Sequence, residues 1–221
     1  MCGRFTIQYT WAEYYDALNL IPATAKGRND PPRFNVCPGQ TFGAVVRDDA
    51  DYQIIDPKWG FIPFWAKEAK FKPINAKGET VATNGMFRTA FAQKRCLIPA
   101  NSYYEWVTPE PKVKLPYNIH LKDDAPFFFA GIWGTNETLD TMTCAIITTK
   151  PHPDIAHIHD RMPVILSADA YEPWLDPATD ADAALALLGQ NRGSELVAYR
   201  VSTDVNSNRS QGSQLIDPID A

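Results

Sequence analysis

The chain has 221 residues, of which 45% are hydrophobic and 21% are charged, and its formal net charge is −5. These values are ordinary for a soluble globular protein with a real core, and they exclude a protein that coats nucleic acid through net positive charge. The longest nearly unbroken apolar run, residues 127–133, is too short to cross a membrane, and the first residues lack the apolar stretch of a signal peptide. We therefore expect a cytoplasmic protein with no membrane partner.

The first element expected along the chain is a short helix over residues 10–20. Thr10 suits its N-cap, and Glu13 three positions later completes a capping box. Residues 21–41 are rich in Pro, Gly, Asn and Asp, which predicts a long loop. Residues 42–47 and 52–56 then predict two strands joined by an acidic turn.

The segment 57–80 has three prolines, two glycines and no sustained hydrophobic period. It predicts irregular surface structure, and ordered irregular segments of this length often carry function.

The rest of the chain predicts a sheet flanked by helices. Residues 85–94 predict a helix, and the apolar runs that follow are typical of antiparallel strands, at 95–100, 103–107, 117–121, 127–133 and 142–149. Two helices at 167–175 and 178–189 and a strand at 196–201 complete the pattern. Without an internal repeat or linker, the sequence predicts one α+β domain over residues 1–221, with a curved or barrel-like, largely antiparallel β centre and flanking helices.

Charge is unevenly distributed in this acidic chain. The stretch from Lys58 to Arg95 holds eight basic residues against two acidic ones. Aromatic residues alternate with these lysines, namely Trp59, Phe61, Phe64, Trp65 and Phe71. Cations beside stacking rings suit a groove for single-stranded nucleic acid, although a solvated lysine-rich loop is an equally common explanation, and we expect Trp59 to be a core residue.

The four cysteines are Cys2, Cys37, Cys96 and Cys144, and none has C-x-x-C spacing. We expect free thiols rather than disulfides or a zinc ribbon, with Cys96 and Cys144 inert in buried strands and Cys37 open to either interpretation.

Cys2 stands out because removal of Met1 would place an α-amine and a thiol on one residue. Their ordinary pKa values, about 8 and about 8.5, leave both groups partly deprotonated at neutral pH. A 1,2-aminothiol reacts preferentially with an aldehyde, since the amine forms an imine and the thiol then closes a five-membered ring.

Three further segments carry polar groups suited to chemistry. Asn75 lies in KPINAKGET with Lys77 and Thr80, and it could orient an amine or a carbonyl or simply stabilise a turn. In NSYYEW, strand alternation places Glu105 on one face with Tyr103, where a carboxylate among aromatic rings is either a paired structural charge or a proton-transfer group.

The third segment, HPDIAHIHDRMPVIL, contains three of the four histidines. Their spacing is a weak metal signal, and we expect no metal or cofactor. A polar loop at HDRMP would instead present His159 as a group titrating near neutral pH, with Arg161 available for a phosphate.

Together the motifs are more specific than any one of them. MCGRF, RFNVCPGQ, WGFIPFW, PINAKGET, YYEW, IHDRMP and VSTDVNS occur in this order and cover nearly the whole chain, which thereby resembles the SRAP family. The resemblance implies a protein of the DNA damage response that binds single-stranded DNA containing an abasic site. It also implies a nucleoid-associated location, and we expect a monomer.

The resemblance further implies roles for individual residues. Processed Cys2 would form a thiazolidine crosslink with the aldehyde of the ring-opened sugar, which shields the lesion and is open to reversal or to a lyase side reaction. Asn75 would position the Cys2 amine or the sugar, Glu105 would act as general acid and base, and His159 would protonate the sugar oxygen. The residues expected to contact DNA are Arg4, Trp65, Lys77, Thr80 and Arg161.

Two positions depart from the family pattern. Lys77 stands where arginine is common, which keeps the charge but loses bidentate phosphate geometry. Cys37 stands where a small apolar residue is more usual, and it adds a second thiol near the expected site.

Two alternative functions use the same residues. An N-terminal-cysteine peptidase or amidohydrolase, able to process its own terminus, would use Cys2 as nucleophile with His159 or Glu105 as base, and it would need an oxyanion hole and a peptide cleft. A non-enzymatic single-strand binder would need only the cations and rings.

Overall fold

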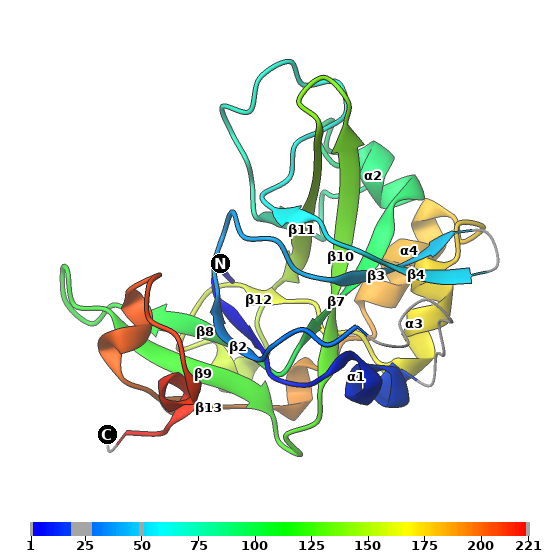
Figure 1. Cartoon of the computed structure of the whole chain (residues 1–221). Helices are drawn as coiled ribbons and strands as arrows, with labels where there is room; N and C mark the ends of the chain where they lie inside the picture. The colour runs from blue at the N-terminus through cyan, green and yellow to red at the C-terminus, as the bar shows by residue number, and fades with distance from the viewer. Residues whose placement is uncertain (1, 19–27, 49–50, 220–221) are drawn as a thin grey trace.

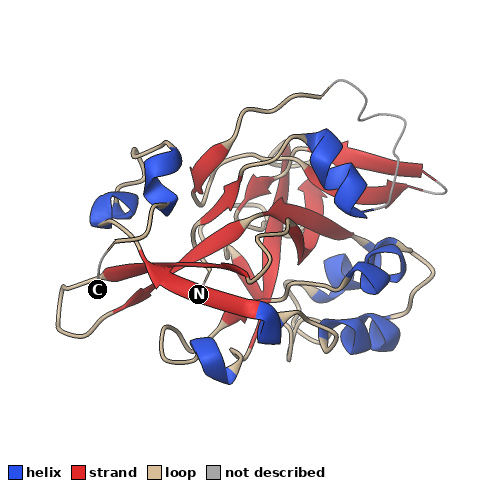
Figure 2. Cartoon of the chain, turned by 90° about the horizontal axis from the view of Figure 1, so that it is seen from below, coloured by secondary structure: helices blue, strands red, loops and turns tan. Residues whose placement is uncertain are grey.

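The computed structural model describes residues 2–18, 28–48 and 51–219. Within them, two β-sheets meet at the N-terminal strand, and the helices lie at their outer faces and edges (Figures 1 and 2). The α-helices of the described residues are α1 (Trp11–Leu18), α2 (Arg88–Gln93), α3 (Ala168–Leu175) and α4 (Ala181–Leu188). Short 3-10 helices are η2 (Pro153–Ile155), η3 (Gly193–Glu195), η4 (Thr203–Asn206) and η5 (Ser213–Ile216).

The first sheet has the strand order β13-β9-β8-β1-β2 and is antiparallel throughout. Its strands are β1 (Phe5–Ile7), β2 (Arg33–Val36), β8 (Ser102–Val107), β9 (Leu115–Leu121) and β13 (Leu196–Arg200). The strand nearest the chain start therefore lies inside the sheet, between β2 and β8, rather than at a frayed edge.

The second sheet has the order β12-β11-β10-β7-β3-β4, with two short strands added along β11. The main strands are β3 (Ala44–Asp48), β4 (Asp51–Ile55), β7 (Arg95–Ala100), β10 (Phe127–Asn136), β11 (Thr141–Thr149) and β12 (Met162–Pro163). The curved, mostly antiparallel architecture with flanking helices confirms the predicted α+β fold class.

The segment 57–80 is not wholly irregular, which corrects the expectation. It contains β5 (Lys58–Trp59) and β6 (Asn75–Lys77), and both pair parallel with β11. Between them the chain forms the projecting loop at the top of Figure 1. Two strands of two or three residues carry no visible alternation, so only pairing with a distant strand defines them.

Phe5 anchors the start of the chain in the core. Its ring meets Trp59 at 5.2 Å, Phe42 at 5.2 Å and Phe129 at 5.6 Å between centroids, each edge to face. Such pairs add to the free energy of burying the rings. Because Phe5 and its three partners are almost fully buried, the residues just before Phe5 have a defined place.

The local helix signals are confirmed where the structure describes them. The Thr10 backbone N–H donates to Glu13 Oε2 at 2.7 Å, and the Glu13 backbone N–H donates to Thr10 Oγ1 at 3.4 Å, as a capping box requires. The end of the expected helix, residues 19–20, lies outside the described residues. The helix expected over 85–94 is shorter, because only Arg88–Gln93 is α-helical.

The described helices are all too short or too polar to span a membrane.

Candidate active site around Cys2

Pairing of β1 with β8 brings Cys2 to Glu105. Phe5 faces Tyr103 in antiparallel register, and the Tyr104 backbone N–H donates to Arg4 O at 3.0 Å. Extending this register places Gly3 opposite Glu105. Cys2 is fully buried, and its Sγ lies 3.9 Å from Arg4 O.

A different strand brings Asn75 to the same place. Parallel pairing of β6 with β11 sets Asn75 opposite Ile146, and Asn75 Nδ2 donates a 2.9 Å hydrogen bond to Cys2 O. Asn75 Oδ1 is buried and accepts no hydrogen bond from the described residues. The amide thus holds the Cys2 backbone with one atom and keeps an acceptor beside it with the other.

Glu105 is 2% exposed at the end of this cluster. Burial disfavours its charged form and raises the pKa of the carboxyl to about 7. A carboxyl with this pKa is present in both protonation states at neutral pH, which suits a group that both accepts and donates a proton.

His159 completes the cluster from the loop before β12. Its Nε2 lies 3.9 Å from Glu105 Oε2, and its Nδ1 accepts the Arg161 backbone N–H at 3.0 Å. The hydrogen bond from Arg161 suits a neutral ring with its proton on Nε2, on the side of Glu105, whereas Asp160 Oδ1, which lies 2.9 Å from Nδ1, suits a ring that carries a proton on Nδ1. Burial lowers the pKa of His159, so the neutral ring predominates at neutral pH.

The Cys2 thiol is held in its protonated form. Burial, followed by the nearby charge of Glu105, raises the pKa of the Cys2 thiol well above its ordinary value. Since the thiolate is the nucleophilic form of cysteine, this thiol is a poor first nucleophile while it stays in this environment.

The guanidinium of Arg161 is engaged by the protein. Its Nη1 and Nη2 donate to the two carboxylate oxygens of Glu79 at 2.6 and 2.8 Å, and Nη2 also donates to Thr148 O at 2.7 Å. This bidentate pair lowers the pKa of Glu79. The phosphate contact expected of Arg161 stays a prediction, and it would require the ion pair between Arg161 and Glu79 to break.

The guanidinium of Arg4 is likewise engaged by the protein. Its Nη1 donates to Asn35 Oδ1 at 2.9 Å and to Val205 O at 2.7 Å, which ties the chain start to η4. Its guanidinium also lies 6.0 Å from the centroid of the Trp106 ring. Its expected contact with DNA stays a prediction.

The remaining expected DNA contacts lie along the β6 side. Lys77 and Thr80 are exposed and line a hollow with Asn75, whereas Trp65 lines a neighbouring hollow to which none of Cys2, Asn75, Glu105 and His159 contributes. The structure therefore brings together Cys2, Asn75, Glu105 and His159.

The sequence did not predict a role for two residues near the site, Tyr103 and Glu79. Tyr103 is fully buried, and its hydroxyl has no hydrogen-bond partner among the described residues. Burial and then the charges of Cys2 and Glu105 raise the pKa of Tyr103, so it is a neutral donor facing the cluster. Alternation in NSYYEW signalled its shared face with Glu105, whereas no sequence signal could pair Glu79 with Arg161.

The other three cysteines are buried thiols. Cys37 Sγ lies 3.3 Å from Asn35 O, and burial raises the pKa of this thiol. Cys96 and Cys144 are fully buried, as expected, and the four cysteines are all free. No group of three or more His, Cys, Asp or Glu side chains in the described part of the chain is placed to hold a metal ion.

Comparison with known proteins identifies the family. The profile described as SOS response associated peptidase (SRAP) matches residues 1–208. The chain belongs to the SRAP family. This SRAP protein is 40% identical over 223 residues to "Abasic site processing protein YoaM" of Bacillus subtilis (strain 168), covering 98% of each chain.

More distant SRAP relatives match over most of the chain as well. "Abasic site processing protein YedK" of Escherichia coli (strain K12) is 30% identical, covering 99% of this chain and 100% of that one. A crystal structure of a Bacteroides thetaiotaomicron protein superposes with a TM-score of 0.82 at 22% identity, covering 99% of this chain and 100% of that one, which shows that the two proteins share a fold.

Proposed function

We propose that this SRAP protein processes abasic sites in single-stranded DNA by forming a covalent bond between Cys2 and the ring-opened sugar. The observation that carries the proposal is the convergence of Asn75, Glu105 and His159 on the residue that becomes the N-terminus when Met1 is removed. The names of the relatives, abasic site processing proteins, support the substrate class.

The reaction begins at the sugar. An abasic deoxyribose is a cyclic hemiacetal that must open to expose its C1′ aldehyde. The protonated form of His159, whose Nδ1 lies 2.9 Å from Asp160 Oδ1, donates its Nε2 proton to the ring oxygen O4′ while the Glu105 carboxylate accepts the proton of the C1′ hydroxyl. The C1′–O4′ bond breaks, C1′ becomes the aldehyde carbon, and His159 is left neutral and Glu105 protonated.

The amine then attacks before the thiol. The α-amine of Cys2 adds to C1′ and loses a proton, and Asn75 Oδ1 is the acceptor that orients it. One amine proton passes to the former carbonyl oxygen, which gives a carbinolamine. Protonated Glu105 then donates to the departing hydroxyl so that one water leaves, and its carboxylate takes the remaining proton from the nitrogen, so an imine remains and Glu105 is protonated again.

Ring closure completes the bond. Sγ of Cys2 attacks C1′, the thiol proton passes to the imine nitrogen, and a thiazolidine forms without oxidant or metal. The order suits the buried thiol, whose raised pKa disfavours attack on a substrate that the amine has not already captured. This is also why we favour aldehyde chemistry over the peptidase alternative, which requires a thiolate from the outset.

Intact mass combined with a denaturing gel tests the proposal. Protein shown to lack Met1 is incubated with a single-stranded oligonucleotide that carries one abasic site. We expect an adduct that survives denaturation and is lost in Cys2→Ser and in protein with a blocked α-amine. If processed protein with an accessible amine gives no adduct, the proposal is wrong, and cleavage of peptide substrates becomes the next measurement.

A further inference from the structure

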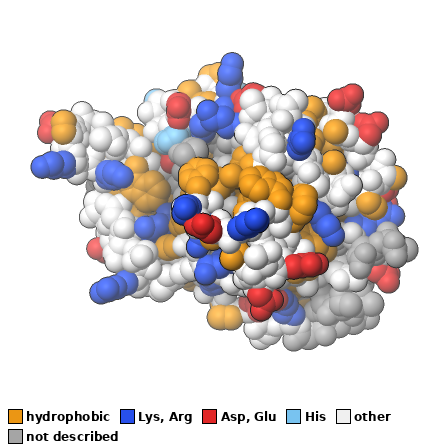
Figure 3. Space-filling model, turned by 90° about the horizontal axis from the view of Figure 1, so that it is seen from above, with side chains coloured by type: hydrophobic (Ala, Val, Ile, Leu, Met, Phe, Trp, Pro, Cys, Tyr) orange, Lys and Arg blue, Asp and Glu red, His pale blue; other side chains and the backbone are white. Residues whose placement is uncertain are grey.

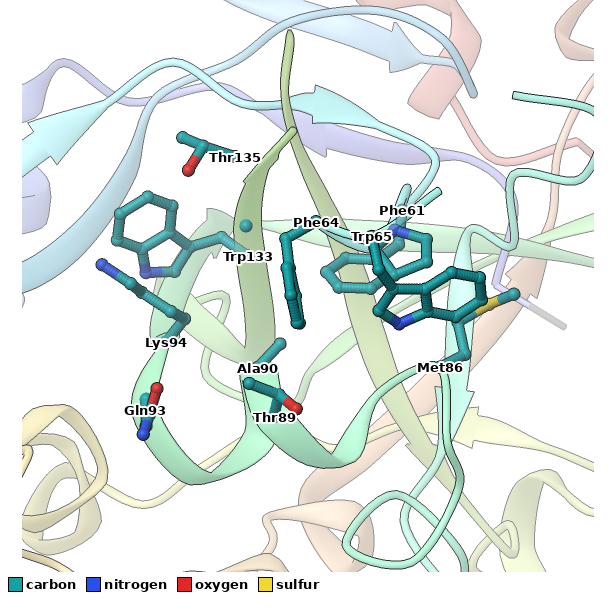
Figure 4. A pocket seen from close by; sticks show the side chains of 12 residues that line it. Phe61, Phe64, Trp65, Met86, Thr89, Ala90, Gln93, Lys94, Trp133 and Thr135 are labelled. Carbon is teal, nitrogen blue, oxygen red and sulfur yellow. The ribbon is translucent and has the colours of Figure 1, made fainter. Parts of the chain in front are cut away.

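A second hollow lies beyond the Cys2 cluster, between the 60–73 loop, α2 and β10 (Figure 4). We call it the aromatic hollow. Its volume is about 290 Å³, and its lining residues are Phe61, Pro63, Phe64, Trp65, Met86, Thr89, Ala90, Gln93, Lys94, Trp133, Gly134 and Thr135. In Figure 4 the Phe64 ring lies between Trp133 with Lys94 on one side and Trp65 on the other.

Two of the rings that line this hollow, Phe64 and Trp65, are largely exposed to solvent. Phe64 is 62% exposed and Trp65 is 56% exposed, whereas Trp59 and Phe61 of the same segment are almost fully buried. Scattered exposed apolar side chains are common, but large rings gathered around one concavity mark a binding surface. Figure 3 shows hydrophobic side chains gathered at the centre of this face, with cationic side chains beside them.

The aromatic hollow also contains a cation, Lys94. Lys94 Nζ lies 4.5 Å from the centroid of the Trp133 ring, within cation–π distance. The lining residues of the hollow include no Asp or Glu. An aromatic slot with a fixed positive charge suits a flat ring attached to an anionic chain.

The aromatic hollow continues toward Cys2. Met86 lines it and also lines the adjoining hollow of about 470 Å³ that contains Phe71, Lys72, Asn75 and Lys77. That second hollow also has no acidic lining residue. Asn75 in turn donates to Cys2 O, so Cys2 is linked to the aromatic hollow through the adjoining hollow, with which the aromatic hollow shares Met86.

We propose that the aromatic hollow binds an unpaired nucleobase of the strand that carries the lesion, away from the reacting sugar. The inference rests on the proposed function for the identity of the strand. Phe64 and Trp133 supply stacking faces, and Lys94 supplies charge for the adjacent backbone. Stacking tolerates every base, so the subsite adds affinity for single strands without sequence preference.

Fluorescence of 2-aminopurine tests this subsite. The base analogue is placed at each position in turn on both sides of a single abasic site, and its emission is recorded in the purified adduct. We expect strong quenching at one or two positions separated from the lesion, because stacking on an aromatic ring quenches this fluorophore. Phe64→Ala, Trp133→Leu and Lys94→Gln are compared with wild type, and Lys122→Gln, an exposed cation outside both hollows, is the matched control.

The variants separate the subsite from the chemistry at Cys2. We expect Phe64→Ala and Trp133→Leu to restore emission and to weaken binding of undamaged dT oligonucleotides about fivefold to a hundredfold. The adduct with an oligonucleotide too short to reach the hollow should form at the wild-type rate. Thermal unfolding checks that each variant is folded, and Lys94→Gln tests the same hollow without altering its apolar wall.

The other possible results distinguish failure of the base-binding subsite from failure of the crosslinking function. Unchanged quenching and unchanged affinity in folded variants overturn the subsite and leave the crosslinking function standing. Wild-type protein that forms no adduct contradicts the proposed function instead. The subsite is then judged by affinity for undamaged oligonucleotides alone, and it is overturned if the three variants bind as wild type does.

Discussion

Asn75 Nδ2 donates a 2.9 Å hydrogen bond to the carbonyl oxygen of Cys2, across 73 positions of sequence. The bond joins β6, which pairs with β11 in the second sheet, to the chain start, which pairs with β8 in the first sheet, so it links the two sheets at Cys2. The other polar atom of the Asn75 amide, Oδ1, is buried and accepts no hydrogen bond from the described residues, which suits an incoming amine donor.

Asn75→Ala should slow adduct formation about fivefold to tenfold, because one hydrogen bond to the reacting residue is worth about 1 kcal/mol. The rate is measured by quenching the reaction into denaturant at timed intervals. Asn84→Ala is the matched control, since Asn84 lines the hollow that also contains Asn75 and Lys77 but makes no hydrogen bond to Cys2. Equal rates in Asn75→Ala and wild type would show that the amide does not position the amine.

Glu105 should make the protein less stable as pH rises. Its pKa of about 7 is higher than the ordinary value of 4.5, so between these values the folded state holds more protons than the unfolded state. The free energy of unfolding then falls with rising pH, by on the order of 3 kcal/mol in full. Glu105→Gln removes this dependence and should therefore gain stability relative to wild type between pH 5 and pH 8 in urea unfolding.

The same Glu105→Gln variant should lose adduct formation, since an amide cannot exchange a proton with the sugar hydroxyl. Stability that rises while the rate falls separates a proton-transfer role from a structural one. A variant that is less stable than wild type at pH 8 would contradict the raised pKa.

Glu79→Gln should tighten binding to undamaged single-stranded DNA several-fold. The substitution removes a negative charge beside the site and releases the Arg161 guanidinium for a phosphate. Fluorescence anisotropy at fixed salt measures the affinity, because such contacts depend steeply on ionic strength. Glu68→Gln is the control, since Glu68 also pairs with a cation, Lys70, but at the surface. An equal gain in DNA affinity in both variants would show that the effect comes from the change in net charge and not from the release of Arg161.

The four thiols should react with iodoacetamide at least about tenfold more slowly in native protein than in urea at pH 8. All four are buried, and burial raises the pKa of each thiol. Peptide mass mapping after timed labelling assigns the rates. Rapid native labelling of Cys2 would contradict the protonated, enclosed thiol and would favour the peptidase alternative.

Arg95 should contribute more to stability than other cations of the basic stretch. It is 5% exposed, and its guanidinium donates to five backbone carbonyls near the ends of α2 and α3, those of Phe91, Ala92, Trp174, Asp176 and Thr179. Arg95→Met should lower the free energy of unfolding by about 3 kcal/mol or more, because several buried acceptors lose their donor. Arg88→Met on the exposed face of α2 should change it by less than about 0.5 kcal/mol.

Most local sequence signals predicted local structure correctly, whereas the loop expected over residues 21–41 was wrong in part, because β2 (Arg33–Val36) lies within it and is defined by its pairing with β1. The Thr10–Glu13 capping box, the 42–56 hairpin and the apolar runs of β7 to β11 all depend on neighbouring residues, and all are confirmed. Likewise, alternation placed Tyr103 on one face of its strand with Glu105, and Tyr103 lies in the main hydrophobic core whereas its neighbour Tyr104 lies in a separate cluster. Motif order was enough to indicate the SRAP family, and the residues that we propose to carry the chemistry could be identified in the sequence.

Relationships between distant segments were decided only by the tertiary structure. Trp59 was predicted to be a core residue, and it is almost fully buried. The sequence could not show that β5 and β6 pair with β11, that Phe61 turns inward while Phe64 and Trp65 turn outward, or that Arg161 is engaged by Glu79. The physical reason is that these pairings join residues far apart in the chain, where strand propensity and hydrophobic period carry no information about partners. The sequence by itself determined which groups are available for reaction at Cys2, and the packing of two sheets determined how they face one another and what their pKa values become.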